Sequence, residues 1–201
     1  MNVYVKICGI TCPEALEAAV QAGADAVGFV FHEASPRNLT PGAAAALAAG
    51  VPSGVHKVAV TLHPAQSLVN DVVDALAPDV WQSDAVDLAS LVLPADVERW
   101  PVYRADAPLP GVLPVRLLFE GARSGAGELA DWSGAARIAR RAELILGGGL
   151  TPENVHAAIT TVRPFGVDVS SGVEAARGRK DPRRIMEFVA AAREAAAGVK
   201  T

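Results

Sequence analysis

The chain has 201 residues, of which 51% are hydrophobic and 20% are charged, with a formal net charge of −4 and a mean hydropathy of +0.27. This length is enough for one core of full depth, and nothing in the composition divides the chain, so we expect a single domain over residues 1–201. The apolar runs are too short to cross a bilayer and no basic cluster is present, which argues against a membrane protein and against a nucleic-acid binder. The first residues lack the pattern of a signal peptide, and we expect a cytoplasmic protein.

Short apolar runs alternate with helical patterns along the whole chain. The first run ends at Cys8-Gly9, and the helix after it has a possible capping box in Thr11 and Glu14 and a stop at Gly23. Later, Thr40 caps a second helix that Pro41 opens, and Thr151-Pro152 caps the seventh. We predict strands at 3–7, 25–30, 56–61, 79–82, 100–104, 115–119, 143–146 and 165–169, and helices at 14–20, 42–49, 64–76, 85–91, 134–140, 152–161 and 182–197.

The alternation has one gap, at residues 105–114, where three prolines and a glycine disfavour a helix. Eight strand–helix units in roughly 200–250 residues predict a (β/α)8 TIM barrel, here with its fifth helix missing or degraded. A doubly wound open sheet is the alternative. It is disfavoured because no Gly-x-Gly-x-x-Gly follows the first strand, whereas glycine-bearing loops follow the seventh and eighth strands.

In such a barrel, the residues just after each strand lie at the end that carries the active site. Cys8 follows the first strand, and its thiolate is a candidate base or nucleophile if a nearby charge lowers its pKa from the ordinary value of about 8.5. The alternative is a small buried hydrophobic residue. Cys8 and Cys12 are the only cysteines and the four histidines are scattered, so we predict no disulfide and no metal site.

Two charged residues are further candidates. Glu120 ends an apolar strand, and a carboxyl group held near apolar walls can act as a general acid; the alternative is a solvated loop carboxylate. Arg37, between Pro36 and Asn38, could present its planar fork to a substrate carboxylate, and the alternative is a surface loop arginine.

The glycine-bearing loops suggest a phosphate site. Gly147-Gly148-Gly149 follows the seventh strand, where three glycines permit close approach to the backbone, although a simple tight turn is the alternative. The companion sequence Ser170-Ser171-Gly172 follows the eighth strand. Two such loops side by side would cradle a phosphate with their backbone amides.

Together, these motifs resemble phosphoribosylanthranilate isomerase of tryptophan biosynthesis. The resemblance extends from the first strand to the last, and rests on 6–11, 23–31, 35–37, 148–155, 167–174 and 178–181. It implies a single-domain TIM barrel that performs an Amadori rearrangement on a small phosphorylated substrate, without cofactor or metal and without nucleic-acid or membrane partners, as a monomer or homodimer.

The resemblance also implies roles for individual residues. Cys8 matches the general base, and Glu120 stands in the place of the family's acid, an aspartate. Arg37 matches the arginine at the anthranilate carboxylate, and Asp168 an acid near the anthranilate end of the site. The residues that match the phosphate site are Gly148, Gly149, Ser171 and Gly172.

The chain departs from the family pattern in two places near the site. Glu120 is one methylene longer than aspartate, and Trp81-Gln82-Ser83-Asp84 replaces the usual Gln-Leu-His-Gly. Two alternatives therefore remain: a related phosphosugar isomerase serving both the histidine and tryptophan pathways, and a catalytically silent barrel that only binds phosphate. Cys8 disfavours the dual enzyme, which is expected to carry an acid there.

Overall fold

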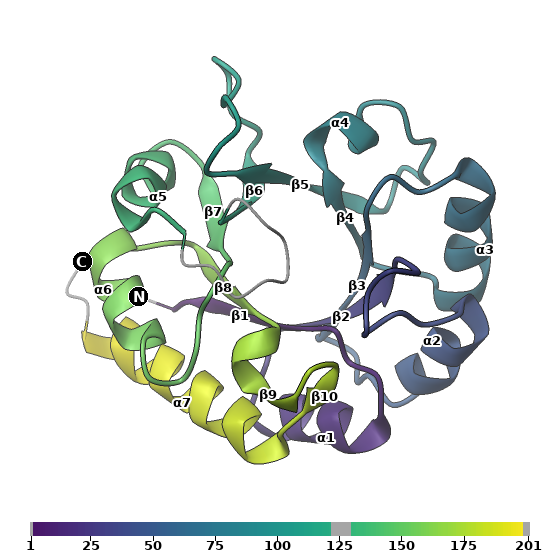
Figure 1. Cartoon of the computed structure of the whole chain (residues 1–201), viewed down its shortest axis with the longest axis horizontal. Helices are drawn as coiled ribbons and strands as arrows, with labels where there is room; N and C mark the ends of the chain where they lie inside the picture. Colours follow the sequence, from purple (N-terminus) through teal and green to yellow (C-terminus); the bar gives the residue numbers. More distant parts are fainter. Residues whose placement is uncertain (1, 122–129, 199–201) are drawn as a thin grey trace.

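The structure is a computed structural model that describes residues 2–121 and 130–198. Eight strands pair in chain order, every neighbour parallel, and β8 pairs with β1 to close a barrel (Figure 1). The predicted TIM-barrel class is thereby confirmed. The strands are β1 (Tyr4–Cys8), β2 (Ala26–Phe31), β3 (His56–Thr61), β4 (Val80–Asp84), β5 (Glu98–Arg104), β6 (Arg116–Glu120), β7 (Glu143–Leu146) and β8 (Gly166–Val169).

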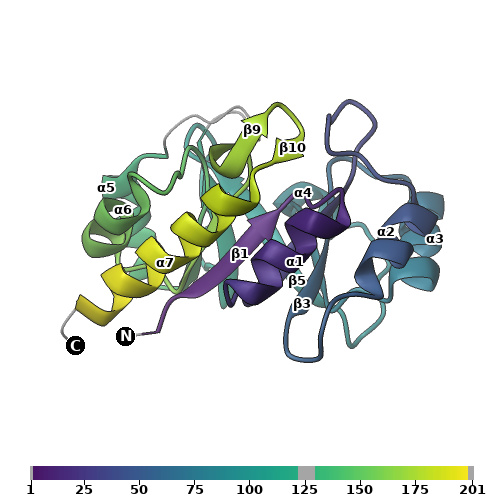
Figure 2. The ribbon, with the colours of Figure 1, turned by 90° about the horizontal axis from the view of Figure 1, so that it is seen from below.

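Helices surround the barrel on its outer side (Figures 1 and 2). They are α1 (Pro13–Gln21), α2 (Pro41–Ala48), α3 (Gln66–Leu76), α4 (Ala85–Leu88), α5 (Trp132–Ala139), α6 (Val155–Val162) and α7 (Pro182–Gly198). After β8 the chain forms a short 3₁₀ helix, η1 (Ser171–Val173), and a small antiparallel hairpin of β9 (Glu174–Ala176) and β10 (Arg179–Lys180). Among the described residues, no helix is both long and apolar enough to span a membrane.

The predicted gap in the helical layer is confirmed. Residues 105–115, between β5 and β6, contain no helix, and their loop reaches away from the barrel between α4 and α5 (Figure 1). Pro108, Pro110 and Pro114 remove the backbone donors that a helix there would need. The loop leaves Val112 and Val115 mostly exposed.

Alternation along each strand sorts residues between two cores. In β1, Val5 and Ile7 point outward and belong to the core between barrel and helices. Tyr4 packs inside the barrel with a second cluster that includes Trp100 of β5. Because side chains of a strand alternate with a period of two, Lys6 and Cys8 share the inward side with Tyr4.

Helix starts agree only partly with the predicted caps. Thr40 does cap α2, since its hydroxyl accepts a hydrogen bond from the Ala43 amide. The Thr11 capping box is wrong, because Cys12 is the N-cap residue of α1 and makes no side-chain cap bond. The Thr151 cap is also displaced, since α6 has Asn154 as its N-cap residue. Residues 122–129, between β6 and α5, lie outside the described residues.

Candidate active site

A pocket of about 280 Å³ opens at the carboxyl ends of the strands. It brings together four of the predicted site residues, Cys8, Arg37, Glu120 and Asp168, from β1, the loop after β2, β6 and β8. This is the end at which TIM barrels carry their active sites. The pocket is also lined by Gln82, Asp84, Arg104 and Arg177.

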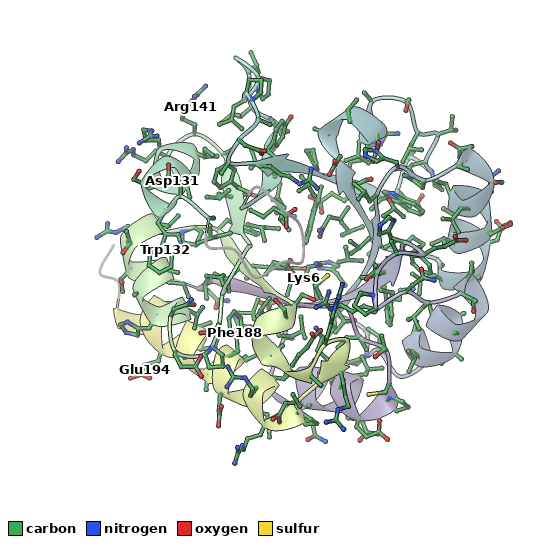
Figure 3. All side chains as sticks on the ribbon, in the orientation of Figure 1. Lys6, Asp131, Trp132, Arg141, Phe188 and Glu194 are labelled. Atoms are coloured by element: carbon green, nitrogen blue, oxygen red, sulfur yellow. The ribbon has the colours of Figure 1, made fainter. Side chains whose placement is uncertain are left out.

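A buried lysine stands beside the Cys8 thiol. Lys6 lies near the centre of the ring of strands (Figure 3), is completely buried, and its Nζ is 2.8 Å from Asp168 Oδ1. The register of β1 against β8 pairs Lys6 directly with Asp168. Lys6 also lies beside Cys8, since Cys8 Sγ and Lys6 Cε both border the space at Gly28, and the two groups influence each other's pKa. Cys8, Lys6 and Asp168 therefore form one connected polar group on the floor of the pocket.

Burial and charge act in opposite directions on this group. Burial raises the pKa of the Cys8 thiol, while the cations Lys6 and Lys180 act to lower it. Burial also works to lower the pKa of Lys6, but the Asp168 carboxylate and Cys8 overcome it and raise that pKa above its ordinary value. Lys6 thus stays charged, and a thiolate formed at Cys8 would be a stronger base than an exposed one.

Gly28 of β2 provides the space for this group. A Cβ added to Gly28 would lie 3.1 Å from Cys8 Sγ and 3.2 Å from Lys6 Cε. Such distances are shorter than ordinary van der Waals contacts, so any side chain there would displace the thiol or the lysine. The glycine is part of the geometry of the site.

Arg37 is held by a carboxylate from the other end of the chain. Its Nε and Nη2 donate to the two carboxylate oxygens of Glu174 at 2.6 and 2.9 Å. Both side chains are nearly buried. Glu174 also accepts a hydrogen bond from Lys180 Nζ at 3.1 Å. Although burial opposes it, the hydrogen bond from Arg37 and the charge of Lys180 hold the pKa of Glu174 below its ordinary value.

Glu120 belongs to a second charged cluster at the opposite side of the pocket. Arg104 Nη1 donates to Asp84 Oδ2 at 2.8 Å, and its Nη2 lies 2.7 Å from Asp84 Oδ1. Arg104 Nε is 3.5 Å from Glu120 Oε1. All three side chains are at most 20% exposed. Asp84 thus balances the arginine charge that faces the candidate acid.

Gln82 contributes an acceptor to the same pocket. Its Oε1 is buried and has no hydrogen-bond partner among the described residues. A buried amide oxygen without a partner costs free energy, which a donor group on a bound ligand would relieve.

The four predicted phosphate residues lie beside one another, outside the residues that line the pocket. Gly148 and Gly149 both have positive φ, 81° and 66°. A Cβ added to Gly172 would lie 1.9 Å from the Leu150 carbonyl oxygen, so the loops after β7 and β8 approach through glycine backbone. Ser170 links the two regions, because it lines the pocket and directly precedes Ser171.

Four charged residues of the site were not among the predicted site residues: Lys6, Arg104, Glu174 and Lys180. Lys6 did carry a signal, because it lies two residues before Cys8 in an apolar strand and therefore on the same face. Arg104 likewise ends a predicted strand. Within the described ranges, no three His, Cys, Asp or Glu side chains are grouped to hold a metal ion. The absence of metal and cofactor stays a prediction.

Comparison with known proteins identifies the family to which this site belongs. Residues 5–191 match the family described as N-(5'phosphoribosyl)anthranilate (PRA) isomerase, PRAI. The chain belongs to this family. The match extends from β1 to beyond β8, and so includes Cys8, Arg37, Glu120 and Asp168.

Relatives named N-(5'-phosphoribosyl)anthranilate isomerase are similar over almost the whole chain. The protein from Geobacter sulfurreducens is 40% identical over 207 residues, which cover 93% of this chain and 97% of the relative. The protein from Paracoccus denitrificans is 42% identical, with 96% and 98% covered.

Solved structures of the family have the same fold. The crystal structure of TrpF from Jonesia denitrificans is 34% identical, covers 98% of this chain and 100% of that one, and has a TM-score of 0.81. A phosphoribosylanthranilate isomerase in complex with reduced 1-(o-carboxyphenylamino)-1-deoxyribulose 5-phosphate is 31% identical, with 96% and 99% covered and a TM-score of 0.76.

Proposed function

We propose that this chain converts N-(5'-phosphoribosyl)anthranilate to 1-(2-carboxyphenylamino)-1-deoxyribulose 5-phosphate, with Cys8 as general base and Glu120 as general acid. The observation that carries the proposal is that residues of this family, matched over positions 5–191, converge on one pocket at the carboxyl ends of the strands. The product analogue bound in a related enzyme supports the substrate class.

The chemistry begins at the ring oxygen of the sugar. Protonated Glu120 gives its proton to this oxygen, the bond between carbon 1 and the oxygen breaks, and the nitrogen lone pair forms an iminium. The iminium acidifies the hydrogen on carbon 2, which the Cys8 thiolate removes to give an enolamine. A proton then adds to carbon 1 and one leaves the 2-hydroxyl, which gives the ketone. The iminium itself accepts the electrons of the broken carbon–hydrogen bond.

The surrounding charges suit these roles. Lys6 and Lys180 favour the thiolate form of Cys8 against the effect of burial. Asp84 offsets the charge of Arg104 beside Glu120, so that the arginine does not by itself enforce the ionised acid. The phosphate is proposed to bind at Gly148, Gly149, Ser171 and Gly172, and the carboxylate near Arg37, with Asp168 at the anthranilate end. We further propose a cytoplasmic protein that acts as a monomer or homodimer.

The test is turnover by the purified protein. Wild-type protein is expected to convert phosphoribosylanthranilate at an enzyme-like rate, and Cys8→Ser and Glu120→Gln are each expected to lower kcat by about 10²–10⁴-fold without unfolding the protein. Matched controls are Cys12→Ser, which alters the cysteine at the start of α1, and Glu98→Gln, which alters a carboxylate at the other end of β5.

Three outcomes would count against parts of this proposal. An inactive wild type that still binds the product analogue would favour the silent barrel. Turnover of the histidine-pathway aminoaldose at a similar rate would favour the dual enzyme. Full activity of Glu120→Gln would remove Glu120 from the role of acid.

A further inference from the structure

The β9–β10 hairpin is built against the loop that carries Arg37. Gly178, in its turn, has φ +79°, and a Cβ added there would lie 2.8 Å from the Pro36 carbonyl oxygen. At its base, Glu174 receives hydrogen bonds from Arg37 and from the Gly178 amide, the latter at 3.0 Å. The hairpin stands at the end of the barrel toward which β1 points (Figure 2). The turn that holds Arg177 is therefore fixed next to Arg37.

The cations at the pocket differ in whether a protein carboxylate already balances them. Arg37 is paired with Glu174, and Arg104 with Asp84. Of the buried lysines, Lys6 is paired with Asp168, and Lys180 shares Glu174 with Arg37. Arg177 also lines the pocket, and within residues 2–121 and 130–198 it makes no hydrogen bond or ion pair. Its guanidinium charge is available to an anionic ligand.

The position of Arg177 favours a carboxylate over a phosphate. It lines the pocket together with Ser35, Pro36 and Arg37, whereas the glycine loops proposed for the phosphate lie outside that lining. Arg37 has already given the edge formed by Nε and Nη2 to Glu174, and Lys180 shares the charge of that carboxylate. A ligand carboxylate at Arg37 therefore finds that edge occupied, and a second arginine beside it would supply further charge-assisted hydrogen bonds.

We infer that Arg177 is a substrate-binding residue, which holds the carboxylate of the anthranilate ring from the side opposite Glu174 and shares it with Arg37. The inference rests on the proposed function for the identity of the ligand. It makes Arg177 a determinant of specificity, since a substrate without the carboxylate gains nothing from it.

The experiment compares Arg177→Gln with Arg179→Gln. Both arginines are exposed on the same hairpin, but Arg179 is not part of the pocket lining, so the pair separates a direct contact from the loss of one positive charge. The probes are reduced 1-(2-carboxyphenylamino)-1-deoxyribulose 5-phosphate and the same compound without the carboxyl group, titrated by calorimetry.

For the carboxylated probe, Kd is expected to rise about tenfold or more in Arg177→Gln, because one charge-assisted hydrogen bond is lost. In Arg179→Gln, Kd for the same probe should stay within about twofold of the wild-type value. For the probe without the carboxyl group, both variants should bind like wild type. In turnover, KM should rise in Arg177→Gln while kcat stays within about twofold, because the contact is made equally in ground and transition states.

The inference is overturned if Arg177→Gln binds the carboxylated probe as tightly as wild type. It is also overturned if the variant loses affinity equally for both probes, since Arg177 would then contact the phosphate, or if Arg179→Gln is equally impaired. A wild type that binds neither probe refutes both the inference and the substrate class. If wild-type protein binds the probes but does not convert phosphoribosylanthranilate, only the proposed activity is refuted. The calorimetric titrations of the two probes still decide the role of Arg177.

Discussion

Replacing Asp168 by asparagine tests the importance of the buried ion pair beneath the pocket. The change removes the carboxylate that lies 2.8 Å from Lys6 Nζ, and Lys6 has no exposed surface through which water could reach it directly. Breaking a buried pair by removing one partner costs roughly 3–5 kcal/mol. The cost has an upper limit, because Lys6 can lose its proton instead. Deprotonating a lysine of ordinary pKa, about 10.4, costs roughly 5 kcal/mol at pH 7.

The pH dependence gives the sign of the effect. In wild type, Asp168 helps to raise the pKa of Lys6 above its ordinary value, so the stability that the pair contributes is present below that ordinary value and is lost only as pH rises through the raised one. In Asp168→Asn, the carboxylate that opposed the effect of burial is gone, so burial lowers the pKa of Lys6. The unfolded chain then binds more protons than the folded one, and the stability of the variant rises with pH. The difference in unfolding free energy between wild type and Asp168→Asn should therefore become smaller between pH 7 and 9.5.

Urea unfolding at several pH values measures both effects. At pH 7 the variant should lose about 3–5 kcal/mol, which lowers Tm by roughly 6–20 °C for a chain of this size. Glu187→Gln is the control, since it breaks the exposed pair with Arg183 and should change stability by about 0.5 kcal/mol or less. The double variant Lys6→Met/Asp168→Leu should regain most of the lost stability but no activity. If Asp168→Asn lost less than about 1 kcal/mol of unfolding free energy, or if the loss did not change with pH, Lys6 would not depend on Asp168 in the way described.

Two other substitutions test the second cluster and a helix cap. Asp84→Asn leaves Arg104 with one carboxylate fewer and thereby stabilises the ionised form of Glu120, so kcat should fall at least about tenfold; an unchanged kcat in steady-state assays would exclude this role. Thr40→Ala removes the hydroxyl that caps α2 and should lower the unfolding free energy by about 1 kcal/mol without changing kcat, and a change of less than about 0.3 kcal/mol in urea titrations would contradict it.

The strand ends were predictable because each depends on local sequence. Apolar runs stop where the barrel opens, and the structure ends β1 at Cys8 and β6 at Glu120, each one residue beyond the predicted end. The missing helix before β6 was predictable for the same reason, since Pro108, Pro110 and Pro114 forbid it locally. Thr11 failed as a cap because Pro13 already sets the first turn of α1, and this leaves Cys12 as the N-cap residue.

The charge pairs of the site were not predictable in this way. Arg37 and Glu174 are 137 residues apart, and Lys6 and Asp168 are 162 apart. Their contact depends on how β8 registers against β1 and on how the hairpin after β8 folds back over the loop after β2. A sequence pattern gives the face on which Lys6 lies, but not the partner that meets it. For the same reason, the sequence did not predict the ion pair between Arg37 and Glu174. The residues next to Arg37 in the chain give no sign of that partner.

The Lys6–Asp168 pair has a cause other than stability. A buried ion pair returns little net free energy to a fold, because desolvation of both charges consumes most of their attraction, and an apolar pair of similar volume serves as well. Tyr4, two residues earlier on the same face of β1, shows the apolar solution, since it packs against Trp100 and Phe165 inside the barrel. One layer higher, the chain instead places Lys6, whose charge acts to lower the pKa of the Cys8 thiol, although burial and the Asp168 carboxylate keep that pKa above its ordinary value. The pair thus stands where the fold gains little from it and where the charge of Lys6 favours a thiolate at Cys8.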